Sequence, residues 1–520
     1  MQTTNEQASL EALLSWLDEQ KEQFVPEIGM LTRPLKGVGY HTTLADGTMV
    51  CSTRENAEYA VLLLKADRVA EAEAILRKVL ALQDREPDHK TYGIWPWFKE
   101  ETLEQMSPPD WNWAAFIGAQ LVVAHRLYAE KMSVDLVQDI ELALKCASEA
   151  IIRRNVTLSY TNIAIMEAVV TATSGEVLED NTFRLHGQER LKSLVGFTQE
   201  QGSFCEFNSL TYTLVALLEL ERALHLLHDE ATLEAVQWLW THAWDVISSH
   251  FHPKTREWAG PHSRAYSDFL SDYQRHILNL RCGQTVCRPA EKTFMSVLDP
   301  IQCPEAFLPR FTTSERAVTC VKQRFSNQHD QPVTGTTWMH PGGCLGSVNT
   351  STFWTQARPV IGYLDLGTGQ PGLIRLRFYH DGKDFASAVV TSEQEEACVR
   401  SCITMRDGHG DYHIHLDRPA DGQFQAESFA VRYELTAPEA EVRQITDQTF
   451  ELTAGKWKAV VTIQHGAYMG NPISWRSGKE GQTAYVEGVM YEGKRTAFSF
   501  PDLASLDLQL TLQLDCLPES

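Results

Sequence analysis

The sequence lacks the segments that would carry a chain into or across a membrane. Its first residues contain neither a basic region nor an apolar run, and they read MQTTNEQASLEALLSWLDEQ. A secretory signal would need both features. No stretch approaches about 18 uninterrupted apolar residues, the length that a membrane-spanning helix requires. We therefore expect a cytoplasmic protein without a membrane partner.

The sequence is also poor in positive charge. It has 46 Lys and Arg residues against 68 Asp and Glu residues, so its formal net charge is −22. Nucleic-acid binding depends on a basic surface that displaces counterions from phosphates, so this composition excludes nucleic acid as an expected partner. An anionic substrate would have to meet a local basic pocket.

Cysteine is present, but it does not form a recognisable framework. The eleven cysteines are odd in number and scattered, as Cys146 is within the apolar run LALKCASEA. This arrangement is typical of buried thiols in a reducing compartment and not of a disulfide scaffold. Neither the pair Cys282 and Cys287 nor the pair Cys398 and Cys402 has the spacing and flanks of a zinc site. We expect neither a bound metal nor a cofactor.

Helical periodicity dominates residues 6–275. Apolar residues recur there at intervals of three and four, which predicts helices with one apolar face. The segments are Leu10–Leu17, Ala57–Lys65, Val69–Leu82, Ala114–Tyr128, Val134–Ile152, Ile163–Val177, Leu210–Leu227 and Thr232–Ile247. The short connections between them favour antiparallel helical hairpins.

Four of these helices begin near an asparagine in a similar setting. The residues are Asn56, Asn112, Asn162 and Asn208, which lie 56, 50 and 46 residues apart. A repeat of about one hairpin predicts a solenoid or a closed ring of hairpins, in which the four helix ends would surround one cleft. The alternative is simple capping, because an asparagine side-chain oxygen readily accepts from a free backbone N–H at a helix start.

The pattern changes after about residue 290. Apolar and polar residues alternate in Gly372–Tyr379, Phe429–Leu435 and Leu506–Leu514, and turns rich in Gly separate such runs. This alternation predicts antiparallel strands with one buried face. We therefore expect an (α/α) helical-hairpin toroid over residues 1–285 and an antiparallel β-sandwich over residues 286–520.

Aromatic residues gather between helices in the first half. Trp95 and Trp97 lie in YGIWPWFKEE, and Trp111 and Trp113 lie in PPDWNW, among Gly and Pro residues that disfavour a regular helix. Indole faces stack well on sugar rings, so these segments predict a sugar-binding site, with loop packing as the alternative. The substrate-binding residues that we predict in this half are Trp95, Trp97, Trp111, Asn112, Trp113, Tyr160 and Asn162.

Two further segments add polar groups that could contact a substrate. In GSFCEFNSLTY, Glu206 and Asn208 precede a helix and Tyr212 follows one turn later. In the second half, the segments WMHPGGC and TFWTQARP could lend side chains to a cleft at the domain interface, where ligand sites often form. The residues concerned are His340, Trp354, Gln356 and Arg358, of which we predict His340 as substrate-binding, with Glu206 and Tyr212.

The segment WAGPHSRAY carries the strongest catalytic pattern. His262, Arg264 and Tyr266 alternate directly after Gly-Pro, so in an extended chain their side chains would point to one side. A lone histidine is more often structural than catalytic. The combination of a titratable ring, a cation and a phenol at alternate positions favours a catalytic role.

In architecture and in the segments EFNSLTY and GPHSRAY, the chain resembles the α-toroid polysaccharide lyases, the class that includes chondroitin, hyaluronan, alginate and heparin lyases. The resemblance covers most of the chain, although no local motif matches a single lyase family. Toroidal glycoside hydrolases that carry a β domain often have it on the N-terminal side, so the domain order favours lyases. The resemblance implies an anionic oligosaccharide substrate that is cleaved at a uronic acid by β-elimination.

The resemblance also implies a role for each catalytic candidate. Asn208 would neutralise the carboxylate beside the acidic C5 proton, and Arg264 would stabilise the developing charge. His262 would be the base, and Tyr266 would be the base or the acid that protonates the leaving oxygen. The known toroid lyases separate His and Tyr more widely than this sequence does, so the assignment of base and acid stays open.

Two other functions are compatible with the same patterns. An inverting glycoside hydrolase could use Asp110 and Glu206, which each precede a repeat asparagine by two residues, if their carboxyl groups face each other about 6.5–9.5 Å apart. A non-catalytic sugar-binding protein would keep the tryptophans but would have no need for His262, Arg264 and Tyr266. The patterns predict no particular oligomeric state.

Overall fold

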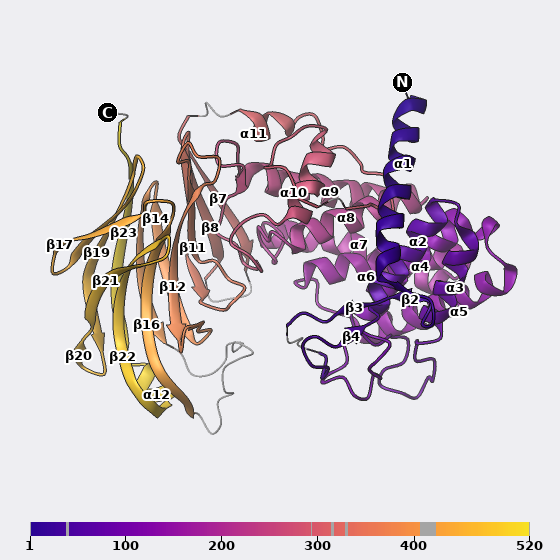
Figure 1. The fold of residues 1–520 in the computed structure, drawn as a ribbon, viewed down its shortest axis with the longest axis horizontal. Coiled ribbons are helices and arrows are strands. Elements are labelled where there is room, and N and C mark those ends of the chain that lie inside the picture. The colour runs from indigo at the N-terminus through magenta and orange to yellow at the C-terminus, as the bar shows by residue number, and fades with distance from the viewer. Residues whose placement is uncertain are drawn as a thin grey trace. The chain divides into compact units, whose positions relative to one another are not determined.

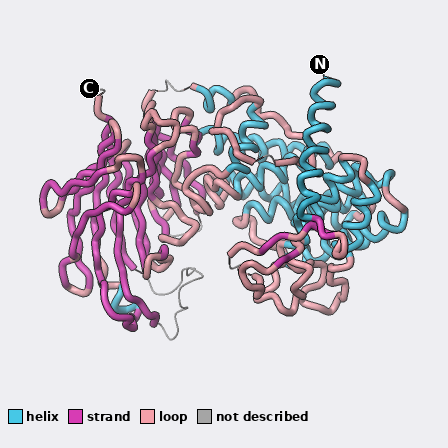
Figure 2. Tube along the Cα trace, in the orientation of Figure 1, coloured by secondary structure: helices cyan, strands magenta, loops and turns pink. Residues whose placement is uncertain are grey.

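The computed structural model of this chain describes residues 2–37, 41–292, 294–313, 317–327, 331–405 and 423–518. Helices fill the first half of the chain and strands fill the second (Figures 1 and 2). This change follows the change in apolar period from about 3.6 residues to 2. The fold class expected from the sequence is confirmed: a toroid-type domain of helical hairpins is followed by an antiparallel β-sandwich domain.

The chain forms two compact units that alternate along the sequence. The helical unit consists of Met1–Phe197, Val215–His242 and Glu291–Ile301, and the β unit consists of Thr198–Leu214, Ala243–Ala290 and Gln302–Ser520. Three helices contribute residues to both units, namely α7 (Asn181–Gln201), α8 (Tyr212–Leu226) and α9 (Glu230–His250). The predicted boundary between residues 285 and 286 stays a prediction.

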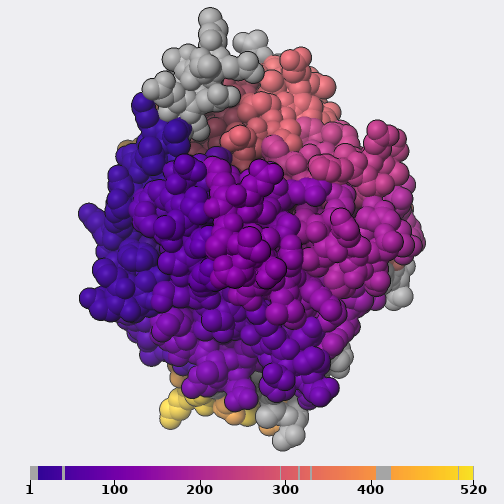
Figure 3. Space-filling model, turned by 90° about the vertical axis from the view of Figure 1, so that its right-hand side faces the viewer, coloured from indigo at the N-terminus to yellow at the C-terminus, as the bar shows by residue number. Residues whose placement is uncertain are grey.

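The helical unit is built from hairpins. Its other helices are α1 (Gln2–Gln20), α2 (Thr53–Lys65), α3 (Val69–Leu80), α4 (Trp113–Tyr128), α5 (Val134–Arg154) and α6 (Thr161–Val177). The short strands β1 (Phe24–Val25) and β2 (Met30–Leu31) pair with each other, as do β3 (Arg33–Pro34) and β4 (Met49–Val50). In the space-filling view of Figure 3, indigo and purple mark the residues of this N-terminal region.

Burial separates the helices into an inner and an outer row. Helix α2 packs on α3 and α4, α4 packs on α5 and α6, and α3 packs on α5. Fifteen of the 17 residues of α6 are buried, whereas only five of the 12 residues of α3 are. A helix that is apolar on all sides must be internal, and an amphipathic one can face water. Helices α2, α4 and α6 therefore form the inner row.

The four repeat asparagines all lie near helix starts. Asn56 is the fourth residue of α2, Asn112 directly precedes α4, Asn162 is the second residue of α6, and Asn208 lies four residues before α8. Asn56, Asn162 and Asn208 are fully buried. Helix α5, in contrast, ends at Asn155, which adopts the left-handed conformation that often closes a helix.

The β unit contains two large antiparallel sheets. One has the strand order β10-β14-β15-β23-β19-β18-β17, with β20 paired to β19, and the other has the order β21-β22-β16-β12-β11-β9-β8-β7, with β13 paired to β12. The strands are β7 (Thr319–Ser326), β8 (Val333–His340), β9 (Gly343–Val348), β10 (Thr350–Thr352), β11 (Val360–Leu364), β12 (Gly372–His380), β13 (Lys383–Asp384), β14 (Ala388–Glu395), β15 (Cys398–Met405), β16 (Gln423–Thr436), β17 (Glu441–Thr446), β18 (Thr449–Ala454), β19 (Trp457–Tyr468), β20 (Asn471–Pro472), β21 (Ser474–Glu480), β22 (Thr483–Ser499) and β23 (Asp507–Cys516).

Strand alternation places one face of each sheet in a shared core. In β12, Leu376 and Phe378 are buried in that core, and they pack with Val431 of β16 and Trp457 of β19. Full burial of such a side chain contributes roughly 1.5–3 kcal/mol. The intervening polar residues of the same strands lie on the outer faces, as the period-two pattern predicts.

The β unit also contains short elements around the sheets. These are β5 (Phe251–His252), which pairs with β6 (Glu257–Trp258), and the helices α10 (Asp272–Cys282), α11 (Leu308–Thr312) and α12 (Phe500–Leu503). Helix α10 starts with a capping box, in which Ser271 and Gln274 satisfy each other's backbone N–H groups. Within the described ranges, no helix combines the length and apolar character needed to cross a bilayer.

Candidate functional site

The segment that carries the predicted catalytic residues is fixed to the β-sandwich through its backbone. His262 and Arg358 exchange two backbone hydrogen bonds, of 3.2 and 2.9 Å, and the backbone N–H of Ala265 donates to the carbonyl of Gln356 at 2.6 Å. The segment passes so close to β9 that a Cβ atom on Gly346 would lie 1.9 Å from the Gly260 carbonyl oxygen. Only glycine fits at that position.

Arg264 is the centre of a polar cluster in the β unit. Its guanidinium donates to Glu206 Oε1 at 2.9 Å and to Gln356 Oε1 at 3.0 Å. It also lies over two aromatic rings, 4.3 Å from the ring centre of Tyr212 and 5.2 Å from that of Trp354. A guanidinium held by a carboxylate, an amide and two ring faces has a fixed position and a fixed charge.

Two tyrosine hydroxyls meet beside this guanidinium. The Tyr212 and Tyr266 oxygens are 2.5 Å apart, and Arg264 Nη2 donates to the Tyr212 oxygen at 3.3 Å. Burial raises the pKa of Tyr212 well above its ordinary value, although the Arg264 charge opposes this effect. Tyr212 is therefore a neutral phenol that can donate its proton, whereas Tyr266 is 59% exposed and reaches solvent.

Asn208 lies in the same unit, but its side chain forms hydrogen bonds with backbone carbonyl groups. Its amide nitrogen donates to the carbonyl oxygens of Ala259 and Pro261 at 2.7 and 2.9 Å, and the indole N–H of Trp258 donates to its side-chain oxygen. Asn208 is fully buried and has a φ of +48°, a conformation that asparagine tolerates better than most residues. Its side chain fixes the start of the segment that leads to Arg264.

The His262 ring is held by the backbone of Asn208. Its Nδ1 lies 2.7 Å from the Asn208 carbonyl oxygen, which can only accept, so Nδ1 carries the proton. Its other ring nitrogen, Nε2, is buried and has no hydrogen-bond partner among the described residues. Burial lowers the pKa of His262 to about 3, so the ring is neutral at ordinary pH. The structure thus brings Arg264 and Tyr266 together through Tyr212, whereas the hydrogen bonds described for the 2% exposed His262 are to Asn208 and Arg358.

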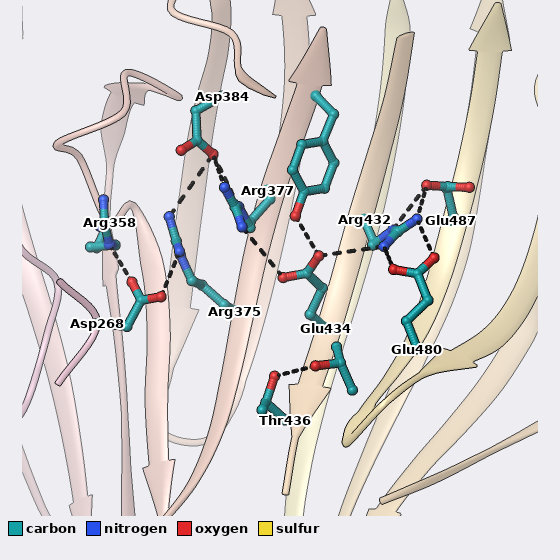
Figure 4. A network of polar contacts seen from close by, with 12 residues as sticks. Asp268, Arg358, Arg375, Arg377, Asp384, Arg432, Glu434, Thr436, Glu480 and Glu487 are labelled. Atoms are coloured by element: carbon teal, nitrogen blue, oxygen red, sulfur yellow. Dashed lines mark hydrogen bonds and ion pairs between the residues drawn. The ribbon is translucent and has the colours of Figure 1, made fainter. Parts of the chain in front are cut away.

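Asp268, two residues beyond Tyr266, also attaches this segment to the sheet, and it was not predicted from the sequence. The Asp268 carboxylate accepts from Arg358 at 2.5 Å and from Arg375 at 2.8 Å (Figure 4). Burial alone would raise the pKa of Asp268, but the Arg375 and Arg358 charges lower it below its ordinary value. Asp268 continues the alternation of positions 262, 264 and 266, and that signal was available in the sequence.

Asp268 is the first member of a chain of charges across the outer face of one sheet. Figure 4 shows Arg375 and Arg377 of β12 at Asp384, and Arg432 of β16 near Glu434. Opposite charges directly across strands stabilise a sheet pair by a few tenths of a kcal/mol up to about 1 kcal/mol. This face therefore holds the Tyr266 segment without presenting excess positive charge.

The predicted aromatic residues of the helical unit differ in their exposure. Trp95 is fully buried and donates its indole N–H to the Val79 carbonyl at 2.9 Å. Trp97 and Trp113 are half-buried and stack on each other, with ring centres 5.1 Å apart. Trp111 is also half-buried and donates to the Lys90 carbonyl at 3.1 Å. Three of the four rings thus retain exposed surface.

A second polar cluster lies at the ends of α4, α5 and α6. Asn112 accepts from Arg154 Nη1 at 2.7 Å and donates to the Tyr160 hydroxyl at 3.4 Å. Arg154 is also 3.6 Å from Glu167, a 2% exposed residue inside α6. Burial raises the pKa of Glu167 to about 7, while Arg154 and Arg190 oppose the rise. The sequence signal that would have identified it is a glutamate inside the apolar run IAIMEAVV of helix α6. Asn162 is buried near the start of the same helix.

The remaining predicted residues have other partners. Asp110 accepts from the Trp97 indole at 3.1 Å and from the Asn112 backbone N–H at 3.0 Å. Glu206 is paired with Arg264, as described above. His340 accepts from the Gly342 backbone N–H and stacks beside Trp338, and burial lowers its pKa. Its described contacts lie outside the Arg264 cluster.

The described residues include no group of three or more His, Cys, Asp or Glu side chains that could hold a metal ion. They do include a large cleft of about 1370 Å³ in the β unit, lined in part by His262, Ser263 and Trp354. Trp354 therefore belongs both to this cleft and to the Arg264 cluster.

Comparison with known proteins gives one family match and several structural likenesses. The family model of a domain of unknown function, DUF8769, matches residues 36–293. No curated protein matches the chain. A crystal structure of heparinase III is 11% identical, covers 90% of this chain and 77% of its own, and has a TM-score of 0.46. A heparinase III gene product with methylated lysines is 9% identical, covers 89% and 77%, and has a TM-score of 0.38. The chain is similar to these proteins, and the expected resemblance to a class that includes heparin lyases is confirmed.

Proposed function

We propose that this chain is a carbohydrate-active enzyme, and specifically a lyase that cleaves uronic-acid-containing oligosaccharides by β-elimination. The observation that carries the proposal is the hydroxyl pair of Tyr212 and Tyr266, 2.5 Å apart beside the fixed cation of Arg264. A hydrolase would need two carboxyl groups for its chemistry. This cluster instead offers two phenols, a cation and a single carboxylate, Glu206, which is held by Arg264.

The hydroxyl pair suits a proton transfer to and from one substrate. We assign Tyr212 as the donor in this hydrogen bond and the Tyr266 oxygen as the acceptor, because burial raises the pKa of Tyr212 and keeps it protonated. In the proposed reaction Tyr266 acts in its deprotonated form and accepts the C5 proton of the uronic acid. The same proton then passes from Tyr266 to the glycosidic oxygen as the C4–O bond breaks and the C4–C5 double bond forms.

Arg264 supplies the positive charge that this reaction requires. Removal of the C5 proton places negative charge on the uronate carboxylate, and a preorganised cation stabilises it without reorganising during the reaction. Asn208 and His262 act in this proposal as positioning residues. The Asn208 side chain holds the carbonyls of Ala259 and Pro261, and the His262 ring donates to the backbone carbonyl of Asn208. The base role first predicted for His262 stays a prediction, and its burial favours Tyr266 for that step.

The half-buried rings of Trp97, Trp111 and Trp113 stay proposed sugar-stacking positions. Tyr160, Asn162 and the other predicted substrate contacts also stay proposals. The cytoplasmic location stays a proposal as well. An anionic substrate is consistent with Arg264, which provides the local positive charge that the acidic chain needs.

The test is a substrate panel with two readouts. The full-length protein is incubated with uronic-acid oligosaccharides while ultraviolet absorbance reports the unsaturated product. Neutral oligosaccharides run in parallel with detection of new reducing ends. A lyase produces absorbance on the uronic-acid panel, whereas new reducing ends without absorbance would identify a hydrolase.

Tyr266→Phe is the decisive variant. It deletes the hydroxyl and keeps the ring, so substrate binding should persist while turnover falls by roughly 10²–10⁴-fold, the usual contribution of a general acid–base group. Tyr273→Phe is the matched control, because Tyr273 is an exposed tyrosine of the same unit on α10. If Asp110→Asn abolishes activity while Tyr266→Phe is nearly silent, the lyase proposal is wrong.

A further inference from the structure

The cleft in the β unit extends well beyond the Arg264 cluster. Its volume of about 1370 Å³ exceeds the roughly 300–1,000 Å³ of ordinary small-molecule pockets. Trp354 lines it beside the cluster, and the outer face of the eight-stranded sheet lines it farther along the chain. The cleft therefore has room for several sugar rings, not only for the one that reacts.

Strand register arranges the side chains of this face in two rows. In one row Glu393 of β14 lies opposite Arg400 of β15, which lies opposite Thr511 of β23. Gln464 of β19 extends this row, because its amide donates to the Thr511 hydroxyl at 2.7 Å. Neighbouring strands are about 4.8 Å apart, so the row spans roughly 14 Å across four strands.

The second row has the same construction. Thr391 of β14 lies opposite Cys402 of β15, which lies opposite Gln509 of β23. All three side chains are exposed, while the adjacent residues Val390 and Leu510 are buried in the sandwich core. Both rows therefore project from the sheet into the cleft.

The chemistry of these rows identifies the kind of ligand they suit. Apart from one glutamate and one arginine, which are of opposite charge and face each other, the side chains are amides, hydroxyls and a thiol. Amides and hydroxyls both donate and accept hydrogen bonds, as sugar hydroxyls do. A polyanion would need a succession of cations, and these rows have no net charge.

We propose that this face is a binding subsite for uncharged sugars, which holds the part of an oligosaccharide that continues from the reacting uronic acid. The proposal rests on the proposed function, because it takes the ligand of the cleft to be the substrate of the Arg264 cluster. Trp354 connects the two sites, since it stacks under Arg264 and also lines the cleft. The substrate is then a glycan in which charged sugars are separated by neutral ones.

Cys402 provides a direct test that needs no substitution. Its thiol is exposed within the second row, whereas Cys320 is an exposed thiol of β7 that does not line the cleft. Iodoacetamide modification of both is followed by peptide mass spectrometry on the full-length protein. The additives are neutral hexasaccharides (β-1,4-glucan, β-1,4-mannan and α-1,4-glucan) or a sulfated heparin hexasaccharide.

A neutral hexasaccharide that binds should protect Cys402 and leave Cys320 unchanged. At ten times its Kd the modification rate of Cys402 should fall about tenfold, because only the free fraction reacts. The proposal is overturned if none of the neutral hexasaccharides protects Cys402, or if the heparin hexasaccharide protects it more strongly than they do.

A variant that blocks the cleft tests the same face by comparing substrates of different length. Gln509→Trp fills the cleft, and Gln444→Trp places the same ring on β17 at the opposite edge of the sheet, outside the cleft. With Gln509→Trp, kcat/KM for a hexasaccharide in which uronic acids alternate with neutral sugars should fall about tenfold. That for a disaccharide of the same repeat should not change, because only the longer chain gains binding energy from the remote subsite. Equal losses on both substrates would overturn the proposal. Absence of all lyase activity with Cys402 protection intact would instead refute the proposed function alone.

Discussion

Asn112 directly precedes α4, whereas Asn208 lies four residues before α8, and their side chains contact different kinds of group. Asn208 binds only backbone carbonyls and a buried indole, and each of these bonds closes a gap between loops of the β unit. Asn112 binds the polar ends of two long side chains, Arg154 and Tyr160, in the helical unit. The same residue type near a helix start therefore holds backbone in one region and belongs to a polar side-chain cluster in the other.

Each region also encloses a titratable group whose pKa burial shifts in favour of the neutral form. Next to Asn208, burial lowers the pKa of His262 to about 3, and next to Arg154, burial raises the pKa of Glu167 to about 7. The two shifts have opposite signs because desolvation disfavours the charged form, which is the acid form of histidine and the base form of glutamate. The regions should thus lose stability at opposite ends of the pH scale.

The largest expected effect is the acid sensitivity of the β unit. The folded-state pKa of His262 lies below its ordinary value of 6.5, so its contribution is complete above pH 6.5 and is lost as the pH falls toward 3. The loss approaches about 5 kcal/mol, at roughly 1.4 kcal/mol per unit of pKa difference. His262→Gln cannot titrate and should remove most of this dependence.

Hydrogen exchange with mass spectrometry measures this effect for each unit separately, after correction for the intrinsic exchange rate at each pH. Peptides of β8 and β9 should lose protection between pH 6.5 and 4 in the wild type and much less in His262→Gln. His250, whose pKa burial lowers to about 4, leaves a residual dependence in both proteins. Identical acid dependence in the two proteins would show that His262 is not the group responsible.

The two regions also differ in which of their features could be predicted from the sequence. The change of period at about residue 290 was enough to predict the fold class, helices followed by antiparallel strands, and the four asparagines all lie near helix starts. The alternation of His262, Arg264 and Tyr266 identified the right segment, but it could not show that His262 turns toward the Asn208 carbonyl. That orientation depends on a contact between residues 54 positions apart, which no local pattern encodes.

The aromatic pattern was ambiguous for a similar reason. Gly and Pro residues near Trp95 and Trp97 disfavour a helix, but they do not distinguish an exposed ring from a buried one. Trp95 is fully buried and Trp97 retains exposed surface, because their surroundings come from different parts of the unit. Glu167, in contrast, could have been found, since a charge inside the apolar run IAIMEAVV of α6 must have a partner or a shifted pKa.

The second prediction concerns the stability of the helical unit at alkaline pH. The folded-state pKa of Glu167 lies above its ordinary value of 4.5, so its contribution is complete below pH 4.5 and is lost as the pH rises through 7. Glu167→Gln should therefore match the wild type at pH 4.5 and exceed its stability by up to about 3 kcal/mol at pH 8. The measurement is the protection of α6 amides against hydrogen exchange.

Glu189→Gln is the control for that experiment, because Glu189 is an exposed glutamate on the neighbouring helix α7. It should leave the pH dependence of α6 protection unchanged. If Glu167→Gln is no more stable than the wild type at pH 8, then Glu167 is already ionised and well paired in the folded protein, and the proposed contrast between the two regions disappears.

The smallest expected effect comes from Asn112, which holds Arg154 close to Glu167. Asn112→Ala removes the acceptor that holds Arg154 at 2.7 Å, and the guanidinium is then free to approach Glu167, now 3.6 Å away. The lost hydrogen bond should destabilise the helical unit by about 1 kcal/mol at pH 5, where Glu167 is mostly protonated. At pH 8 the closer cation lowers the pKa of Glu167, so the difference from the wild type should shrink.

In the double variant Asn112→Ala/Glu167→Gln the loss should be the same at both pH values. A difference that instead grows with pH would mean that Asn112 supports the helix ends directly, as Asn208 supports its loops, and not through Arg154.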